Sequence, residues 1–585
     1  MKKSILFLTF LMLLFTNITE ISAKPKGSSL LILARDKFPE ARFGSAEKRL
    51  FKALQEGKPV SYEDDLKRPV IKANLIQWLC TNRKAIPKIT EFGISIRGAH
   101  ILGDLDLQTA NVPFPLKFDN CVFGSDTLPG TVVHRPRTVW GLAIEKFPEE
   151  KFGKAEKLIF EAIRQGKSVN FDKANPKRKV NIKSDLLQWL CTDSEVREKI
   201  KNKGISISGM NVTGNLDLKN AHIPFPLQFH NSSFTNINLQ RSHILSLDMR
   251  GSTVKSIDGW RMNVNRSLLL CLGFEASETV RLMEARIGGH LNLHGGKFKD
   301  LDMNKMIVKY NAYLREGFIA SGKVNLNGAK IGGQLDCGGG SFTTLDMQKA
   351  SIGKSLFLNN GFVAKDNVYL NGAHIGMQLV AVKGHFHNLY MQKINVGDIV
   401  FLRDGFEAIG DVNLDGALIA GHLDCRDGKF TNLDISKSKI SKSVYLGSGF
   451  EATKKVNLSN TDIGGFVDCS NGSFSNLNME QAKIKDAVFL TDGFQSSKKV
   501  NLMNAKIDGS LDLRNGYFRS LNMEKMTVGD AFIINSAFEV DGVLNLKNAK
   551  VNTLKDEKDS WAKVDNLNLE GFEYNAIHDK GSMGV

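Results

Sequence analysis

A repeat of 44 residues constrains the fold of this chain more than any other feature. Leucines recur in unbroken register at Leu282, Leu326, Leu370, Leu414, Leu458, Leu502 and Leu546. Phenylalanines keep the same period at Phe298, Phe342, Phe386, Phe430, Phe474 and Phe518. A strict period of this length is typical of a solenoid or a propeller and not of an ordinary globular domain.

Each repeat contains a shorter rhythm of mostly apolar pairs, separated by steps of about five residues. In the copy from 324 to 367 the pairs are Val324/Leu326, Ala329/Ile331, Leu335/Cys337, Gly340/Phe342, Leu345/Met347, Ala350/Ile352, Leu356/Leu358 and Asn360/Phe362. One repeat therefore holds two coils with four sides each. The longer strands and the Trp-Asp signature of a propeller blade are missing. The pattern predicts an all-β solenoid, a right-handed parallel β-helix with a quadrilateral cross-section.

The N-terminal part of the chain contains a duplication, residues 35–124 and 144–234. Trp78-Leu79-Cys80 returns as Trp189-Leu190-Cys191, 111 residues later. Each copy opens with an amphipathic helix that ends at Gly57 or Gly166, continues with a second short helix, and then enters the coil pattern. We expect two small helical modules whose coils stack on the main β-helix of residues 235–550 and cover its first edge. Residues 235–270 look like a less regular transition, and residues 551–585, with Trp561, look like a C-terminal cap.

Residues 1–23 have the features of a secretory signal peptide. Lys2 and Lys3 precede an apolar run from Ile5 to Phe15, and Ala23 is suited to cleavage. The run is shorter than the ~20 residues that a spanning helix needs, although an uncleaved anchor is the alternative. We therefore expect an exported protein, periplasmic or extracellular.

The repeat resembles a known family. The segment GFIASGKVNLNGAKIGGQLDCGGGSF (317–342) resembles the repeat of bacterial pentapeptide-repeat-like β-helix proteins often labelled membrane-associated oxidoreductase. LNLEGFEYNAI (567–577) resembles the segment that closes their solenoid, and IKANLIQWLCTN (71–82) resembles their N-terminal helix. The resemblance covers most of the chain after residue 23, and it implies a loosened pentapeptide-repeat β-helix and, through the label, a redox activity.

Catalytic and metal-binding motifs are absent from the sequence. It contains no G-x-S-x-G, Walker loop, H-E-x-x-H or dinucleotide fingerprint. Cys337, Cys425 and Cys469 share one inward column with leucine and alanine, which makes them core residues rather than ligands or disulfide partners. His385 and His387 flank inward Phe386 and point outward together, but no second-shell partner accompanies them. We therefore predict no catalytic residues, no metal and no cofactor.

The outward columns provide the candidate binding residues. One face carries aromatic rings at Tyr313, Phe357, Phe401, Tyr445 and Phe489, alternating along the solenoid with Asp336, Val380, Asp424, Asp468 and Asp512. Rings beside acidic acceptors suit a chain of sugars, although rings that stack between coils would merely stabilise the fold. A second face carries an Asn/Asp column, which we interpret as a backbone-bonding ladder. A third carries Arg286, Lys330, Lys439, Lys483, Lys506 and Lys550.

These features favour an exported, non-enzymatic scaffold or binding protein of the cell envelope. Its long faces would engage a glycan or other envelope polymer, or a protein partner. The formal charge of +16 also suits contact with an anionic polymer or a membrane surface, whereas lysines on a solenoid equally serve solubility. A nucleic-acid role is not expected. The alternatives are a polysaccharide-active β-helix enzyme, with its site at 124–143 or 235–270, and an oxidoreductase. The oligomeric state is left open.

Overall fold

The computed structural model describes residues 29–65, 68–107, 110–124, 138–172 and 179–579. The expected signal peptide lies outside these residues. The chain divides into two compact units, residues 1–150 and 151–585. The helices of the described residues all precede residue 201 and are α1 (Leu30–Lys37), α2 (Ser45–Glu56), α3 (Ala73–Thr81), α4 (Val139–Lys146), α5 (Lys154–Gln165), α6 (Ser184–Thr192) and α7 (Ser194–Ile200).

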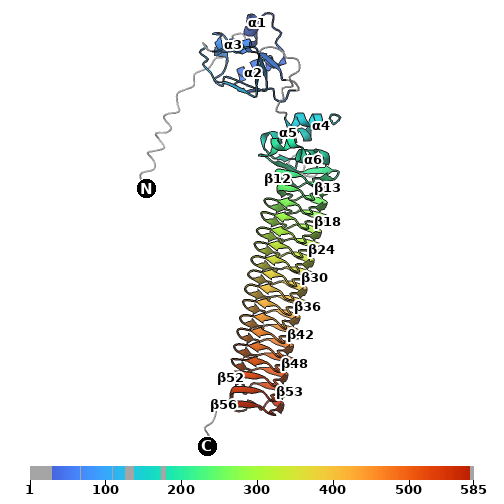
Figure 1. Cartoon of the computed structure of the whole chain (residues 1–585), viewed down its shortest axis with the longest axis vertical. Helices are drawn as coiled ribbons and strands as arrows, with labels where there is room; N and C mark the ends of the chain where they lie inside the picture. Colours follow the sequence, from blue (N-terminus) through green and yellow to red (C-terminus); the bar gives the residue numbers. More distant parts are fainter. Residues whose placement is uncertain (1–28, 66–67, 108–109, 125–137, 173–178, 580–585) are drawn as a thin grey trace, which may run out of the picture. The chain divides into compact units, whose positions relative to one another are not determined.

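The second unit is an elongated parallel β-solenoid, as the repeat predicts (Figure 1). One repeat is built from β24 (Ile319–Asn325), β25 (Lys330–Ile331), β26 (Leu335–Asp336), β27 (Ser341–Asp346), β28 (Ser351–Ile352), β29 (Leu356–Phe357) and β30 (Val363–Tyr369). β24 pairs with β27, β25 with β28, and β26 with β29, always in parallel. The register shifts between Ala320 and Lys323, where the longer strands turn a corner. Each coil therefore has four sides.

The sequence pairs place their side chains inside the coil, as expected, except that Asn360 is exposed in a left-handed turn. Val324, Leu335 and Cys337 are at most 1% exposed, and Ile331 and Ala350 are 3% exposed. Cys425 and Cys469 are fully buried and free. Burial raises the pKa of the Cys425 thiol well above its usual value, so the thiol stays protonated. The cysteines are core residues, as their column predicts.

The two phenylalanine columns of the sequence form one stack in the structure. The ring of Phe342 packs against Phe318 at 4.9 Å and against Phe362 at 5.2 Å between centroids. The same contacts continue without a break from Phe274 to Phe538. Successive coils thus place their rings at the same corner, and the stack runs through the length of the core.

The Asn/Asp column forms the predicted ladder of bonds to the backbone, and it also forms a ladder of side-chain amides. Asn478 donates to Asn457 at 3.0 Å, Asn501 to Asn478 at 2.9 Å, and Asn522 to Asn501 at 2.8 Å. Asn545 extends the series to Asn522 at 2.9 Å. The same Oδ1 atoms also accept from backbone N–H groups two residues ahead, as Asn545 does from Lys547 at 3.1 Å. Each amide therefore ties a coil to the next coil and to its own turn.

Replacing Asn501 with aspartate should break this ladder. A carboxylate cannot donate to the Oδ1 of Asn478, and it adds negative charge near Glu480. We expect the free energy of unfolding to fall by about 1 to 3 kcal/mol in guanidinium denaturation. Asn460→Asp is the matched control, because Asn460 is exposed at a corner outside the ladder. Equal stabilities for the two variants would show that the ladder contributes little.

The second helical module continues directly into the solenoid. β8 (Val180–Lys183) pairs with β10 (Met210–Thr213), and β10 pairs with β13 (Ser233–Asn238). β9 (Ile205–Ser208) pairs with β12 (His222–His230), and β12 pairs with β14 (His243–Asp248). Residues 235–270, expected to be irregular, form regular coils, with β13 paired to β15 (Thr253–Asp258).

The first module folds in the same way but forms its own sheets. β1 (Val60–Ser61), β3 (Ile94–Arg97) and β5 (Leu116–Asp119) make one, and β2 (Val70–Lys72), β4 (His100–Leu102) and β6 (Val122–Gly124) make the other. Within the described residues these strands pair only with each other. The expectation that the modules stack on the solenoid through their strands is confirmed for the second module, and for the first module it stays a prediction. The α2 helix ends at Gly57 with φ 64°, as expected.

The C-terminal region differs from the expected cap. β54 (Lys550–Asp556) and β56 (Glu573–Asp579) pair in parallel, and β55 (Val564–Asn568) pairs with β53 (Glu539–Asn545). Trp561 lies in the turn between β54 and β55, where its Nε1 donates to Asp556 at 2.9 Å. The described part of this region is therefore one more coil of the solenoid.

Candidate functional site

The aromatic and acidic residues predicted as a binding face lie in one row of the solenoid. Tyr313, Phe357, Phe401, Tyr445 and Phe489 are all half-buried, on β23 (Ala312–Tyr313), β29, β35 (Val400–Phe401), β41 (Val444–Tyr445) and β47 (Val488–Phe489). Register places Asp336 between Tyr313 and Phe357. Asp424, Asp468 and Asp512 occupy equivalent positions between or beside the later rings. The structure thus brings together the residues that the sequence selected.

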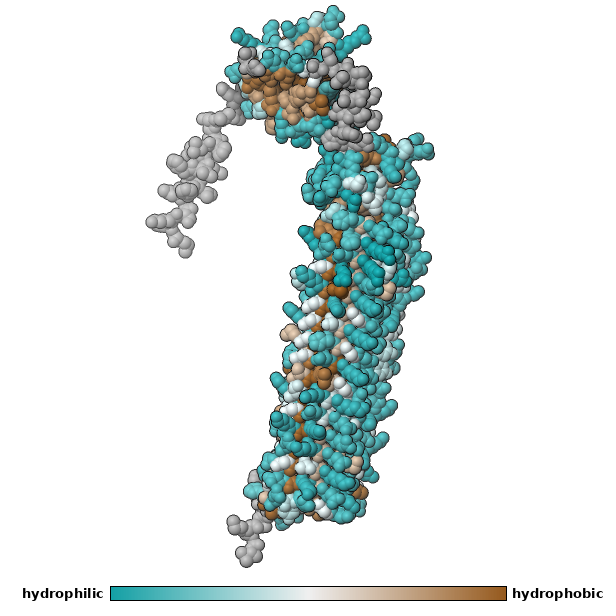
Figure 2. Space-filling model, in the orientation of Figure 1, coloured by the Kyte–Doolittle hydropathy of each residue, from teal (hydrophilic) through white to brown (hydrophobic). Residues whose placement is uncertain are grey.

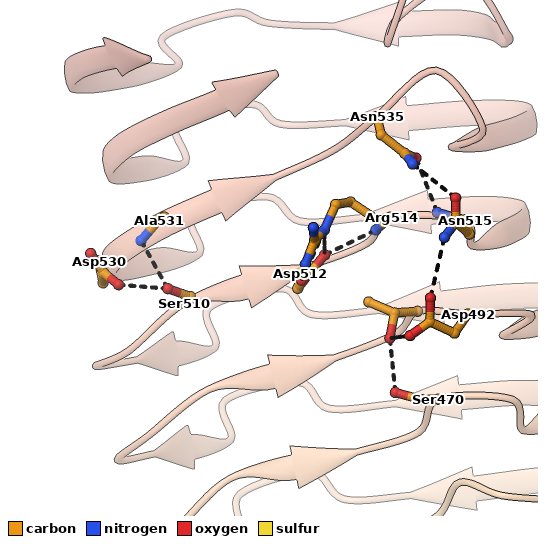
Figure 3. A network of polar contacts seen from close by, with 10 residues as sticks. Ser470, Asp492, Ser510, Asp512, Arg514, Asn515, Asp530, Ala531 and Asn535 are labelled. Carbon is orange, nitrogen blue, oxygen red and sulfur yellow. Dashed lines mark hydrogen bonds and ion pairs between the residues drawn. The ribbon is translucent and has the colours of Figure 1, made fainter. Parts of the chain in front are cut away.

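Asp336, Asp424 and Asp512 of this row have arginine partners, whereas Asp468 forms no ion pair within the described residues and accepts from the backbone N–H of Ser470 at 2.9 Å. Asp424 is nearly buried and forms ion pairs with Arg426 at 2.7 Å and Arg403 at 3.3 Å. Its hydrogen bond raises the pKa of the Arg426 guanidinium. Asp512 is held in the same way by Arg514 at 2.7 Å, as Figure 3 shows. These oxygens also accept from backbone N–H groups, such as that of Arg514 at 3.1 Å. Few lone pairs of Asp424 and Asp512 are therefore left for a ligand.

Arginines also cover three of the rings. The guanidinium of Arg403 lies 4.8 Å from the centroid of Phe401, and that of Arg426 lies 4.8 Å from Tyr445. Arg315 lies 5.3 Å from Tyr313. Phe357 lines a shallow hollow of about 210 Å³ beside Asp336 and Gly338. The row is largely an internal network of rings, arginines and carboxylates.

A different row of side chains is both exposed and basic. It occupies the corner between the Asn ladder and the following side of each coil. The corner positions hold Arg241, Arg261, Lys305, Lys349, Lys393, Lys437 and Lys525, and the positions two residues later hold Arg286, Lys330, Lys439, Lys483, Lys506 and Lys550. All are exposed. Glu284 and Asp462 are the acidic residues that interrupt these two columns between residues 241 and 550. We call this surface the basic edge.

The corner lysines adopt a backbone conformation that lysine disfavours. Lys305, Lys349 and Lys393 have φ of 53°, 55° and 55°, and Lys437 and Lys525 also have 55°. A non-glycine side chain in this left-handed region costs on the order of 1 kcal/mol. The alternate coils place Gly328, Gly372, Gly416, Asn460, Asn504 and Asn548 at the same corner. Glycine or asparagine would therefore serve the turn better, and the lysines are not explained by the fold.

Much of this charge has no acidic partner. Lys437 lies 3.4 Å from Asp415, and Lys506 lies 3.0 Å from Asp508. Within the described residues, no ion pair closer than 4.0 Å forms at Arg286, Lys305, Lys330, Lys349, Lys393, Lys439 or Lys483. Lys483 and Lys506 lie directly opposite each other on paired strands of adjacent coils. Like charges placed directly opposite are destabilising unless an anion lies between them.

The basic edge was only half visible in the sequence. The sequence pattern indicates the column at Lys330 and Lys439 as an outward face, but the corner column is not among the faces that it indicates. The recurrence of lysine every 44 residues at 305, 349, 393 and 437 is the signal that reveals it.

The remaining candidate residues give weaker support for a functional site. His385 and His387 are exposed, as predicted, and His385 lies 3.3 Å from Glu407. In the described parts of the chain, no three His, Cys, Asp or Glu residues are grouped as metal ligands. No helix among the described residues is long and apolar enough to cross a bilayer. No family model, curated protein or solved structure matches the chain.

Proposed function

We propose that the protein is an exported, non-enzymatic scaffold that binds a linear acidic polysaccharide of the cell envelope along its basic edge. The observation that carries this proposal is the column of strained, exposed lysines at a corner where glycine and asparagine also fit. A stability cost that recurs in register along the molecule requires a benefit outside the fold. Electrostatic attraction to an extended anion is such a benefit.

The geometry suits a polymer rather than a small molecule. Corner lysines lie two coils apart, which corresponds to ~9.6 Å at the spacing of parallel strands. The second basic column runs beside them, on the alternate coils at Lys330, Lys506 and Lys550 and on the same coil at Lys439. An extended chain with regularly spaced carboxylates or sulfates would meet one cation after another. Export, the envelope location and the absence of catalysis belong to this proposal as well.

The test is a variant in which Lys305, Lys349, Lys393, Lys437 and Lys525 are all changed to asparagine. We expect weaker binding to heparin and to polygalacturonate, measured by titration calorimetry at low salt. At about 0.5 kcal/mol for each exposed ion pair, the loss is about 2.5 kcal/mol, or roughly 70-fold in affinity. Wild-type affinity should also fall steeply as salt is added. The melting temperature should stay equal or rise, because asparagine tolerates a positive φ.

Lys383→Asn is the matched control. Lys383 has φ 55° but lies at the other left-handed corner of the coil, outside the basic edge. This variant removes the same strain and a single charge, and it should keep almost all of the affinity. Unchanged binding by the fivefold variant, or equal retention of the wild type on neutral dextran, would refute the proposal. A lower melting temperature of the fivefold variant would show that the lysines serve the fold.

A further inference from the structure

The first module exposes apolar residues at the end of its coil, whereas the equivalent residues of the second module are buried. The positions concerned are half-buried, or exposed in the case of the last: Leu105, Leu107, Val112, Phe114, Leu116, Phe118, Cys121 and Phe123. Their counterparts 111 residues later are Leu216, Leu218, Ile223, Phe225, Leu227, Phe229, Ser232 and Phe234, and all are buried. Phe123 is 49% exposed, whereas Phe234 is 7% exposed. The two modules share a pattern but differ in what covers this end.

The second module shows what a covered end requires. There Leu227 of β12 pairs with Leu247 of β14, and Phe234 of β13 pairs with Val254 of β15. In the first module, the described partners of β5 and β6 are β3 and β4, on one side only. Within the described residues no strand pairs with the other edge, and Figure 2 shows apolar side chains at the surface of this unit. An open, apolar strand edge is a template for another chain.

We propose that this end is the dimer interface of the protein, covered by the same end of a second copy in a two-fold-symmetric arrangement. Strand β5 would pair antiparallel with β5 of the second copy, centred on Phe118. Such pairing places Lys117 of each copy opposite Asp119 of the other, which is favourable across strands. Phe118 then meets Phe118 of the second copy, as the residue on a two-fold axis must.

Charge placement supports this occupant over a continuing coil. Asp119 is held at the edge by Arg97 at 2.9 Å, and Lys117 lies 3.7 Å from it within the same chain. Alternation of one lysine and one aspartate about a central phenylalanine is self-complementary only in the antiparallel sense. A parallel coil, such as the one that covers the second module, would not place a second Lys117 and Asp119 opposite these two residues.

The test uses the full chain and sedimentation equilibrium at micromolar concentration. We expect the wild type to sediment at twice the monomer mass. Lys117→Asp should give a monomer, because it places two carboxylates opposite each other, and Asp119→Lys should give a monomer by pairing two lysines. An equimolar mixture of these two variants should recover the dimer, since each strained pair is then replaced by an opposite-charge pair. Phe118→Asp should give a monomer that mixing does not rescue.

Lys48→Asp on α2 is the control for the change in charge, and it should remain dimeric, since Lys48 is exposed on a helix. Circular dichroism of each variant checks that it is folded. A wild type that stays monomeric would overturn the proposal, and protection of Phe118 in that monomer would show that the end is covered within one chain. A dimer that survives both charge changes would place the interface elsewhere.

Discussion

Cys425→Asp should lower the free energy of unfolding by more than about 4 kcal/mol. Cys425 is fully buried in a column shared with Leu293, Ala381 and Leu513, and burial already holds its thiol in the protonated form. An aspartate there must either bury an unpaired charge or take up a proton. Guanidinium denaturation followed by circular dichroism measures the loss.

Cys425→Ala is the control, and it should cost about 1 to 3 kcal/mol because it only leaves a small cavity. The difference in the free energy of unfolding between the two variants should depend on pH. Burial raises the folded-state pKa of the new carboxyl above its unfolded value, so its penalty is smallest at low pH and grows as the pH rises. The two variants should therefore differ less in their free energies of unfolding at pH 4 than at pH 7. Equal and small losses for both variants would show that position 425 does not face the core.

Phe406→Ala should strongly destabilise the solenoid at the aromatic stack. Phe406 is fully buried, and its ring packs 5.2 Å from Phe386 and 4.9 Å from Phe430. Removing it leaves a cavity between two coils and breaks two ring contacts, at a cost of about 3 to 5 kcal/mol. Chemical denaturation reports the size of the loss, and hydrogen exchange reports its place.

The exchange data should show a local effect, because each coil of a solenoid contacts only its neighbours. Faster exchange is expected in β33 (His385–Tyr390), β36 (Glu407–Asn413) and β39 (Lys429–Asp434). Phe406→Leu should cost less than half as much, since leucine fills most of the volume. A loss below about 1 kcal/mol with unchanged exchange in these strands would mean that the stack is not a major source of stability.

The basic edge and the aromatic row show how far sequence reasoning reaches for a site. The row at Phe401 and Tyr445 was found because outward residues alternate with buried ones in every strand. Its interpretation as a free binding face depended on whether Asp424 had a partner. Asp424 has two partners: Arg426 lies two residues later in the sequence, whereas Arg403 comes from the preceding coil, 21 residues away, and the sequence period alone did not indicate that pairing.

The sequence by itself determined the solenoid, its inward columns and the duplication. These follow from local rules, because alternation in a short strand and repetition in register decide which side chains are buried, as Cys425 and Phe342 show. Only the tertiary structure decided that two phenylalanine columns merge into one stack, that Asn457 to Asn545 form a side-chain ladder, and that Lys305 sits in a left-handed turn. It also separated two modules of like pattern, since Phe234 is covered by the coil that follows and Phe123 is exposed. The physical reason is that these properties depend on contacts between coils. The partner of a residue in such a contact lies 20 or more positions away in the sequence. The repeat determines the register of the strands, but it does not determine which residue each outward side chain contacts.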